Sequence, residues 1–524
     1  MKLRLQPGAP RITECLLASL AALAALQVRA GDWLQYRGPN HDGVSAEIIR
    51  TNWPITPPRQ IWKVPLDQAL SSFTISGSNV FTQVRRTING QDTEVCIALN
   101  ADTGRELWAT PVGMAYYPDG GVGSDDGPRS TPSVDGNQVF VLASYLNLLC
   151  LGINDGHVIW SNNLAANYNS IVIPWQNAAS PLIENGLIFL NCNAPGNWLL
   201  ALHEADGTQA WIQQSNLTTG DLMTQASPIA ATIAGVRQIV FFAQSGLVSV
   251  APANGSIFWR YPFPFSVATA ASPVASSNMV YCSAAYGVGA GAVQITNSGG
   301  QLATNQVWRT PFTTMNHWAT PVLYNGYLYG IYGQAGTAAS IRCIELATGN
   351  ERWRQSAQMG GLLLTTGVLL VAQEDGTLLL VSPDPAGYNE VARYRALDGS
   401  SNSIPGLAVR CWNVPAISNG RIYVRSTTEA VCLDVSPSTS LKLSGALSGQ
   451  DGAFRLFIGT QDNSPLDTNR AANIDVLAST NLTLDLSGWV KLTNPAVLTN
   501  GLLFLDDPQG TFAPRRFFRA QEHP

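Results

Sequence analysis

A single register of tryptophans runs through most of this chain and restricts its fold more than any other feature. Seven of the 14 tryptophans are separated by 46, 52, 51, 48, 49 and 45 residues, and a tyrosine extends the series after 41 more. In five of these units a glycine stands four residues before the tryptophan. The residues in register are Trp62, Trp108, Trp160, Trp211, Trp259, Trp308, Trp353 and Tyr394. A period of about 40–50 residues is typical of architectures built from one repeated supersecondary unit.

A second landmark, a serine or threonine followed by proline, runs in phase with the tryptophans. Five such prolines are 45 to 49 residues apart, and Pro415 follows after 94 residues, so one unit lacks its proline. Within the units, Asn-Gly and Asp-Gly pairs such as Asn325-Gly326 separate short apolar runs. These pairs favour two-residue β-hairpins. Four short antiparallel strands in about 47 residues are typical of a β-propeller blade.

The number of units predicts an all-β, eight-bladed β-propeller over residues 61–436, closed by an N-terminal strand. Seven units end at an aromatic residue of the register, whereas the eighth, from Pro415 to residue 436, has none of its own. Trp62 stands before the first full unit. We therefore expect residues 61–64 to pair with a strand of the eighth blade and cover an exposed sheet edge. The repeated tryptophans are interpreted as structural wedges between blades.

Both ends of the chain lie outside the repeat. Residues 1–30 combine a basic head, an apolar run of about 12 residues and a small-residue cleavage point after Ala30, the pattern of an export signal; an uncleaved anchor is the alternative. A leader follows over 31–60. After a Ser/Pro linker at 437–440, alternating apolar residues over 441–524 predict a small β-sandwich. We expect a periplasmic or cell-surface protein with no transmembrane span after signal removal.

Composition and motifs restrict the kinds of site. The net charge is −5 and the basic residues do not cluster, which argues against nucleic acid as a partner. The five histidines lack metal-ligand spacing, and no nucleophile elbow or phosphate loop occurs. The sequence therefore assigns no metal ligand and no catalytic residue. Four cysteines, Cys96, Cys150, Cys343 and Cys432, are expected to share one strand position as buried free thiols.

The residues just before the Ser/Thr-Pro landmarks are expected to gather around the axis at one mouth of the ring, because every blade places this position alike. Arginines among aromatic and amide side chains suit a small planar anion or a peptide strand. We expect the two arginines to anchor such a ligand and the tryptophans Trp318 and Trp412 to stack on it; the alternative is that these residues only plug the ring. The candidates are Arg129, Trp175, Gln176, His317, Trp318, Arg410, Trp412 and Asn413.

Over about residues 60–436 the unit resembles the pyrroloquinoline-quinone repeat of exported bacterial quinoprotein-like β-propellers. The leader segment 33–45 and the blade opening Gly127-Pro128-Arg129-Ser130-Thr131-Pro132 are similar to segments of that group. The resemblance implies the propeller fold. It leaves the function open, because the same propeller serves alcohol and sugar dehydrogenases and also non-catalytic scaffolds.

Two functions follow from this resemblance. Calcium-dependent quinoprotein dehydrogenases carry a pair of adjacent cysteines, which this sequence lacks, and a CxxCH haem motif is absent as well. Asp119, Asp125 and Asp126 suit calcium by residue type, but we interpret them as solvated turn residues. The main hypothesis is an exported non-catalytic scaffold that binds an unidentified protein or a small anionic ligand. The alternative is an oxidoreductase that uses pyrroloquinoline quinone with calcium on a small alcohol or sugar.

Overall fold

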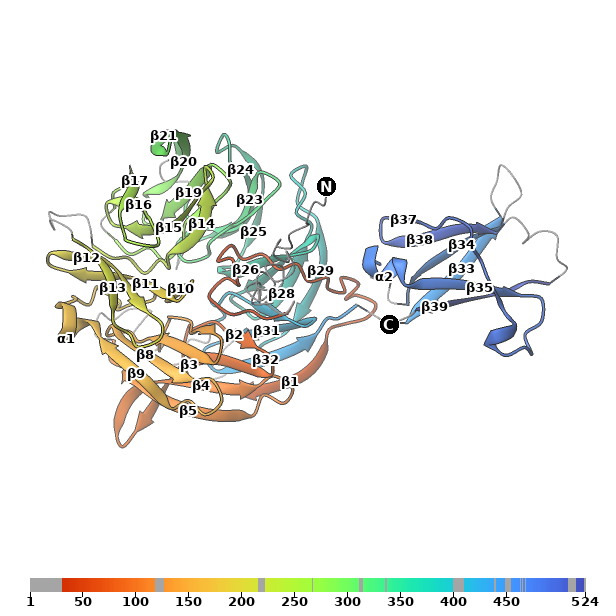
Figure 1. Cartoon of the computed structure of the whole chain (residues 1–524), viewed down its shortest axis with the longest axis horizontal. Helices are drawn as coiled ribbons and strands as arrows, with labels where there is room; N and C mark the ends of the chain where they lie inside the picture. The colour runs from red at the N-terminus through yellow and green to blue at the C-terminus, as the bar shows by residue number, and fades with distance from the viewer. Residues whose placement is uncertain are drawn as a thin grey trace, which may run out of the picture.

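The computed structural model describes residues 31–117, 127–214, 222–265, 267–310, 314–334, 337–398, 410–437, 440–447, 454–461, 463, 465–466, 468–507 and 515–522. Most of this chain forms antiparallel β-sheets (Figure 1). The helices in these ranges are short: α1 (Leu164–Tyr168), α2 (Thr468–Ala472) and the 3-10 turn η2 (Leu486–Gly488). Within the same ranges, no helix has the length and apolarity needed to cross a membrane. The predicted export signal, residues 1–30, lies outside the described residues.

Eight four-stranded antiparallel sheets follow one another between Arg59 and Asp434 in the described ranges, and we number them one to eight in chain order. Sheets one to four are β2 (Thr74–Ser76), β3 (Asn79–Ile88), β4 (Gln91–Asn100) and β5 (Glu106–Met114); β6 (Ser133–Asp135), β7 (Gln138–Leu142), β8 (Asn147–Gly152) and β9 (Val158–Asn163); β10 (Leu182–Glu184), β11 (Leu187–Ala194), β12 (Asn197–His203) and β13 (Gln209–Gln214); and β14 (Ile229–Ile233), β15 (Val236–Ala243), β16 (Gly246–Val250) and β17 (Ile257–Pro262).

Sheets five to seven are β18 (Val274–Ala275), β19 (Met279–Ala284), β20 (Gly289–Ser298) and β21 (Gln301–Thr310); β22 (Val322–Tyr324), β23 (Tyr327–Tyr332), β24 (Ala339–Glu345) and β25 (Glu351–Ala357); and β26 (Gly360–Thr365), β27 (Val368–Gln373), β28 (Thr377–Val381) and β29 (Glu390–Arg395). Sheet eight joins β30 (Ala416–Ser418), β31 (Arg421–Arg425) and β32 (Glu429–Asp434) to β1 (Arg59–Pro65) from the other end of the chain.

The sheets are arranged in a ring, with the first strand of each sheet innermost (Figure 1). Innermost strands of neighbouring sheets contact one another, as β2 does with β6 and β6 with β10, and β2 also contacts β30 of the last sheet. β1 pairs antiparallel with β32, and Trp62 lies opposite Cys432. This pairing confirms the expectation that residues 61–64 complete the last repeat unit.

The repeated tryptophans pack against glycine turns of the following sheet. For five of the glycines, an added Cβ would lie only 2.4–2.8 Å from the indole ring, and these glycines have φ between 69° and 75°. Each of these indole nitrogens also donates to a carbonyl of the next sheet at 2.7–3.1 Å. The pairs are Trp62/Gly104, Trp108/Gly156, Trp160/Gly207, Trp211/Gly255 and Trp308/Gly349. Five of the seven tryptophans thus contact the next sheet in this way, and the glycine of each Gly-x-x-x-Trp motif receives the preceding tryptophan. The Trp259 indole instead donates to Gln238 Oε1 of its own sheet.

The Ser/Thr-Pro landmark also links sheets to one another. The hydroxyl before the proline accepts a hydrogen bond from a backbone N–H of the preceding sheet, as Ser180 Oγ does from Thr131 and Ser227 Oγ from Ser180, both at 2.9 Å. Ser72, which precedes Phe73 instead of proline, accepts from Val414 of the last sheet at 3.0 Å. These bonds satisfy buried backbone donors that face the axis.

The leader crosses the inside of the ring and contacts innermost segments of several sheets. Trp33 exchanges two backbone hydrogen bonds with Ile75. The side-chain amide of Gln35 forms two hydrogen bonds with the backbone of Ile183. The buried Arg37 guanidinium donates to the carbonyls of Thr320 and Pro321 at 2.8 Å. These bonds tie sheets one, three and six to one segment.

The cysteines are buried free thiols, as predicted, but one of the four does not share the predicted strand position. The seven cysteines of the described residues are buried and free. Three of them, Cys150, Cys343 and Cys432, lie opposite Trp160, Trp353 and Trp62. Cys96 does not share this position, because Ala98 is the residue opposite Trp108. Since residues two apart on a strand face the same side, Cys96 is nevertheless buried on the same face of its sheet.

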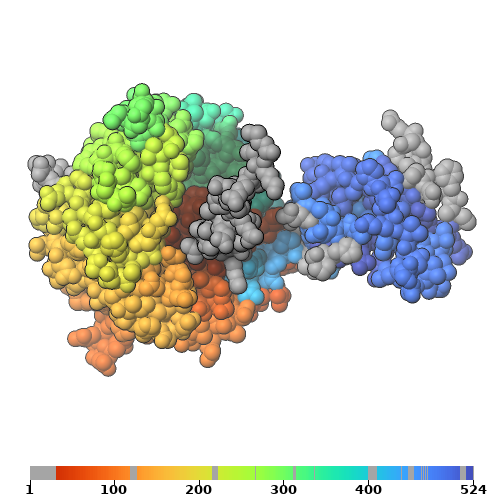
Figure 2. All heavy atoms as spheres, in the orientation of Figure 1, coloured from red at the N-terminus to blue at the C-terminus, as the bar shows by residue number. Residues whose placement is uncertain are grey.

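The C-terminal segment forms two further sheets that enclose their own core. β33 (Leu441–Leu447), β34 (Phe454–Thr460), β38 (Leu502–Asp507) and β37 (Val497–Thr499) form one sheet, and β36 (Val490–Lys491), β35 (Ile474–Ser479) and β39 (Phe517–Glu522) form the other. Leu456, Val476 and Leu503 belong to their shared apolar core. Figure 2 shows this segment, in blue, as a body beside the ring.

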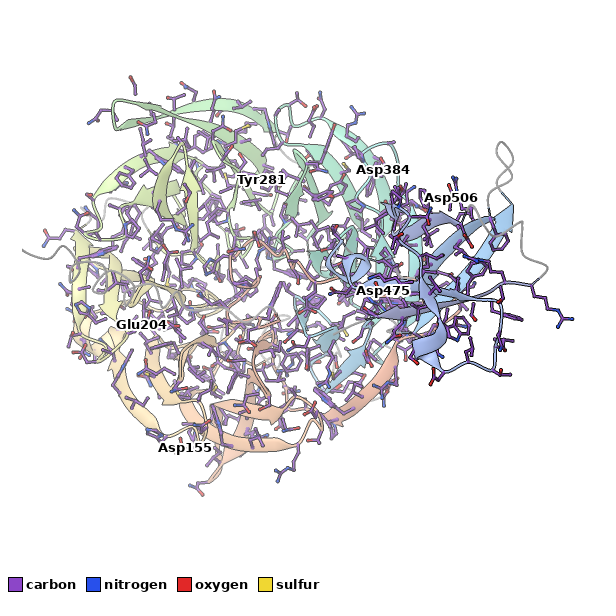
Figure 3. All side chains as sticks on the ribbon, turned by 45° about the vertical axis from the view of Figure 1, so that its right-hand side comes forward. Asp155, Glu204, Tyr281, Asp384, Asp475 and Asp506 are labelled. Carbon is purple, nitrogen blue, oxygen red and sulfur yellow. The ribbon has the colours of Figure 1, made fainter. Side chains whose placement is uncertain are left out.

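Glu204 gives the ring a predicted pH dependence. It follows β12 (Figure 3), and its carbonyl accepts the Trp160 indole N–H. Burial, reinforced by the nearby Asp135 carboxylate, raises the pKa of Glu204 to about 8. Since the unfolded pKa lies near 4.5, the folded state retains a proton that the unfolded state loses, and stability falls as pH rises from about 5 to 8.

We therefore expect Glu204→Gln to be more stable than the wild type at pH 8, with a smaller difference at pH 5. Asp135→Asn, which removes the neighbouring carboxylate, should reduce the same pH dependence. Thermal unfolding at several pH values measures both effects. Parallel curves for Glu204→Gln and the wild type would contradict this account.

Candidate functional site

A cavity of about 350 Å³ lies at the mouth where the innermost strands begin. Six of the eight candidate residues line it: Arg129, Trp175, His317, Trp318, Trp412 and Asn413. Tyr36 of the leader, Gln225 and Tyr286 line it as well. We call this cavity the axial cup, and the other described residues that line it are Leu70, Ser72, Ala178, Ser227, Ala268, Thr269, Ala270 and Val414. The equivalence of the positions before the innermost strands was sufficient to predict six of the 17 described lining residues.

Two candidates do not line the cup. Gln176 is buried, with its backbone N–H bonded to the Ile173 carbonyl. The Arg410 guanidinium lies over the Trp412 ring, 4.7 Å from its centre. Arg410 is not among the described lining residues. The expected convergence of Arg129 and Arg410 is therefore corrected: of the two, Arg129 lines the cup.

Trp318 and Trp412 form an aromatic wall. Their ring centres are 4.2 Å apart at an interplanar angle of 32°. The Trp318 indole donates to the Gly360 carbonyl at 3.2 Å, and the Trp412 indole to Glu374 Oε1 at 2.9 Å. The two rings come from sheets six and eight and meet across sheet seven. They contact each other, so they form a rigid wall of the cup and not two separate stacking faces.

Sheet seven, which stands between the two sheets that supply these rings, lacks the repeated proline. Gly361-Leu362 stands where sheets two to six carry the Ser/Thr-Pro landmark. A Cβ added to Gly361 would lie 2.5 Å from the Asn413 carbonyl oxygen. The absence of a side chain at Gly361 therefore allows the backbone of the segment before sheet eight to approach sheet seven closely.

His317 lies between the wall and Tyr286. Its ring centre is 4.9 Å from that of Trp318 and 5.1 Å from that of Tyr286, and the Tyr286 hydroxyl lies 3.3 Å from His317 Nε2. Burial lowers the pKa of His317 to about 4. The histidine is therefore neutral at pH 7 and adds aromatic surface to the cup without adding charge.

Two exposed aromatic residues of the cup adopt a backbone conformation that favours glycine. Trp175 has φ 60° and Tyr286 has φ 56°. Their side chains are 38% and 43% exposed. Left-handed backbone at a bulky residue costs of the order of 1–3 kcal/mol and is concentrated at functional sites. Two such residues at one cavity therefore support a role in binding.

Arg129 is supported by a buried network. Its Nη1 donates to the Trp175 carbonyl at 3.0 Å, and its guanidinium carbon lies 5.7 Å from the centre of the Tyr117 ring. The Tyr117 hydroxyl donates to Glu94 Oε1 at 2.6 Å, and the Ser144 N–H donates to Glu94 Oε2 at 2.8 Å. Burial raises the pKa of Glu94. This arrangement fixes the tyrosine on which the arginine packs.

Asn413 carries an unusual acceptor. Its Nδ2 donates to the Ser71 carbonyl at 2.8 Å, which fixes the amide orientation. Its Oδ1 is buried without a hydrogen-bond partner among the described residues. A buried acceptor left unpaired is costly, of the order of 1–3 kcal/mol, so each one requires an explanation.

The described residues of the cup do not supply the ligands that a calcium-bound quinone needs. Calcium is held by oxygen ligands, carboxylates above all, and the described lining residues include no aspartate or glutamate. In the part of the chain that the structure describes, no group of three or more His, Cys, Asp and Glu side chains could hold a metal. Asp119, Asp125 and Asp126 lie outside the described residues.

Comparison with known proteins agrees with this architecture. A family model described as outer membrane protein assembly factor BamB matches residues 91–338. The protein of that name from Moranella endobia (strain PCIT) is 21% identical over 337 residues, which cover 62% of this chain and 69% of the relative. The repeats are of the pyrroloquinoline-quinone type.

Solved structures share the quinoprotein-like fold. BamB from Moraxella catarrhalis matches with a TM-score of 0.51 at 12% identity, covering 72% of this chain and 99% of that one. The quinohemoprotein alcohol dehydrogenase from Comamonas testosteroni matches with a TM-score of 0.54 at 10% identity, covering 81% and 84%. The same fold therefore occurs both in an assembly factor and in a dehydrogenase. The fold does not decide between these functions, so a function must be inferred from the residues of the cup.

Sequence reasoning missed two aromatic residues of the cup. Tyr36 comes from the leader, whose path through the ring no repeat pattern specifies. Tyr286 lies in the turn between β19 and β20, on the mouth side but away from the equivalent positions. Its following residue, Gly287, was a turn signal that pointed to this loop.

Proposed function

We propose that this chain is an exported, non-catalytic binding scaffold, and that its axial cup is the binding site. The eight sheets would be the blades of one closed propeller over residues 61–436, preceded by a leader (31–60) and followed by a linker (437–440) and a β-sandwich (441–524). The observation that carries the proposal is the cup, an aromatic cavity with a few fixed polar groups. Cavities of this kind are the usual form of a small-ligand site.

The relatives support the scaffold part of the proposal. The matching family model and the relative from Moranella endobia are both described as an outer membrane protein assembly factor. From this description we propose a periplasmic or cell-surface location and a protein partner for this chain. The oxidoreductase alternative is disfavoured by the donor chemistry of the cup, because the described lining supplies no carboxylate for calcium.

Filling the cup tests the proposal. Ala268 lines the cup, whereas Ala303 lies exposed on β21. A library of small aromatic fragments is screened by ligand-observed NMR against the wild type, Ala268→Trp and Ala303→Trp. We expect fragments that bind the wild type to bind Ala303→Trp equally and to lose affinity for Ala268→Trp. Equal binding to all three proteins would exclude the cup as the site.

The non-catalytic part is tested separately. The purified protein is incubated with pyrroloquinoline quinone and calcium, and dye reduction is followed with a panel of small alcohols and sugars. We expect no turnover above the protein-free control. Substrate-dependent dye reduction would overturn the scaffold proposal in favour of the oxidoreductase.

A further inference from the structure

A second, smaller cavity adjoins the axial cup. Its volume is about 40 Å³, compared with about 350 Å³ for the cup. A space of roughly 10–15 Å³ holds one water molecule, so the smaller cavity accommodates a larger group than that. We call it the side pocket. It is lined by Met223, Phe265 and Val267, among others, and by three residues that also line the cup, Trp175, Gln225 and Ala268.

The three shared residues form a ridge between the two cavities. The Gln225 N–H donates to the Thr269 carbonyl at 3.1 Å, and Gln225 Nε2 donates to the Pro174 carbonyl at 2.9 Å. Arg129 Nη1 donates to the Trp175 carbonyl at 3.0 Å. These bonds join the segments before sheets two, three, four and five. The ridge is therefore fixed before a ligand binds, which lowers the entropic cost of binding.

The charges of the two cavities do not require a charged ligand. The described lining of the side pocket is mostly apolar and contains no charged residue. In the cup, the Arg129 guanidinium interacts electrostatically with the buried Glu94 carboxylate, so its charge alone does not select an anion. The flexible thioether of Met223 adapts to the shape of an apolar group in the side pocket. We therefore expect an uncharged aliphatic group there.

Two cavities on either side of a narrow ridge match alternate side chains of an extended chain. Residues i and i+2 of such a chain point the same way and lie about 6.6 Å apart. A backbone that crosses the ridge thus places one side chain in each cavity, and pockets for alternate side chains are a known mode of peptide recognition. The larger cavity, with the Trp318–Trp412 wall, suits an aromatic ring, whereas the side pocket suits a smaller group.

We propose that the cup and the side pocket together bind an extended segment of a partner protein, with an aromatic side chain in the cup and an aliphatic side chain two residues away in the side pocket. This inference rests on the proposed function of the cup as a binding site, and it specifies the chemistry of the protein partner. It differs from a small aromatic ligand, which would occupy the cup alone.

Capped five-residue peptides test the spacing. The reference peptide has tryptophan at position two, leucine at position four and serine elsewhere. One control replaces the leucine by alanine, a second replaces the tryptophan by alanine, and a third moves the leucine to position three, where an extended chain points it away from the side pocket. Ligand-observed NMR on the full chain measures the dissociation constants. We expect the reference peptide to bind about tenfold more tightly than each control, a difference of about 1.4 kcal/mol.

A matched pair of variants assigns the leucine preference to the side pocket. Val267 lines the side pocket and is not among the described residues that line the cup. Val307 is 41% exposed on β21. Val267→Trp should bind the leucine and alanine peptides equally, whereas Val307→Trp should retain the tenfold preference. If Val267→Trp does not fold, the comparison of the two leucine positions on the wild type decides between acceptance and rejection.

The outcomes separate this inference from the proposed function. Fragments that bind the wild type but not Ala268→Trp, together with peptides whose affinity does not depend on the leucine or on its position, would refute the extended segment and leave the cup as a small-ligand site. A leucine preference that persists in Val267→Trp would also refute it, because the leucine would then bind elsewhere. Failure of every fragment and peptide to bind would refute both proposals.

Discussion

Arg425→Leu is expected to destabilise the ring by about 3–5 kcal/mol, the loss typical of breaking a buried charged network. Arg425 of β31 is 1% exposed, and its guanidinium donates to Thr82 Oγ1 and to the carbonyls of Gln83 and Asp67 at 2.8–3.1 Å. These acceptors belong to the first sheet and the segment before it, so this side chain joins the last sheet to the first. Leucine fills part of the volume but removes the donor from two buried acceptors, Thr82 Oγ1 and the Gln83 carbonyl, and from the part-buried Asp67 carbonyl.

A second arginine of the same strand provides the control. Arg421 pairs with Asp102 at 2.6 Å, also across the closure, but the Asp102 side chain is 64% exposed and that of Arg421 is 29% exposed. Arg421→Leu should therefore cost less than about 1 kcal/mol. Urea unfolding followed by tryptophan fluorescence measures both variants. Equal losses would show that closure depends on surface charge and not on the buried guanidinium.

Gly255→Ala is expected to cost about 2–4 kcal/mol, and Gly235→Ala about 1 kcal/mol. Both glycines have positive φ, 70° and 79°, so alanine pays a similar backbone cost at both. They differ in their surroundings: a Cβ on Gly255 would lie 2.4 Å from the Trp211 ring, whereas nothing lies within 4 Å of a Cβ on Gly235. The difference in free energy of unfolding between the two variants therefore isolates the tryptophan–glycine contact.

A double-mutant cycle checks the assignment. In the Trp211→Leu background the ring that meets the new Cβ is gone, so Gly255→Ala should cost about as little as Gly235→Ala. An undiminished cost in that background would place the strain in the turn itself. The same logic applies to the other four tryptophan–glycine pairs of the ring.

The repeat register carried most of what the sequence could predict. Trp62 before the first unit was sufficient to predict its pairing with the last, because a propeller unit without a closing strand has an exposed edge. The Ser/Thr-Pro landmark located six cup residues, since equivalent positions in a ring converge on its axis. Both inferences depend on periodicity, which the sequence displays directly.

Features that break the repeat could not be predicted in this way. The place of Tyr36 depends on how the leader crosses the ring, and this is decided by long-range bonds such as that from Arg37 to Thr320. Arg410 lies in the segment expected to line the cup, but its guanidinium packs on the Trp412 ring and the residue is not part of the lining. The offset of Cys96, by contrast, was visible in the sequence, because Cys96 stands 12 residues before Trp108 whereas Cys150 and Cys343 stand 10 residues before their tryptophans. Side-chain packing and long-range bonds decide the other cases, and neither has a repeat signature.

The pairing of β1 with β32 also has a consequence for how the chain becomes folded. Trp62 and Cys432, partners in one sheet, stand 370 positions apart in the sequence. The strand made first must therefore wait, unpaired, until almost the whole ring has emerged from the ribosome or the export channel. Contacts of such high sequence separation form slowly, because the entropy of a very long loop is lost before any bond is gained. During that interval both ends of the ring expose strand edges to other chains, so we expect dilution to favour productive refolding and the closing strand to be the last element protected from hydrogen exchange.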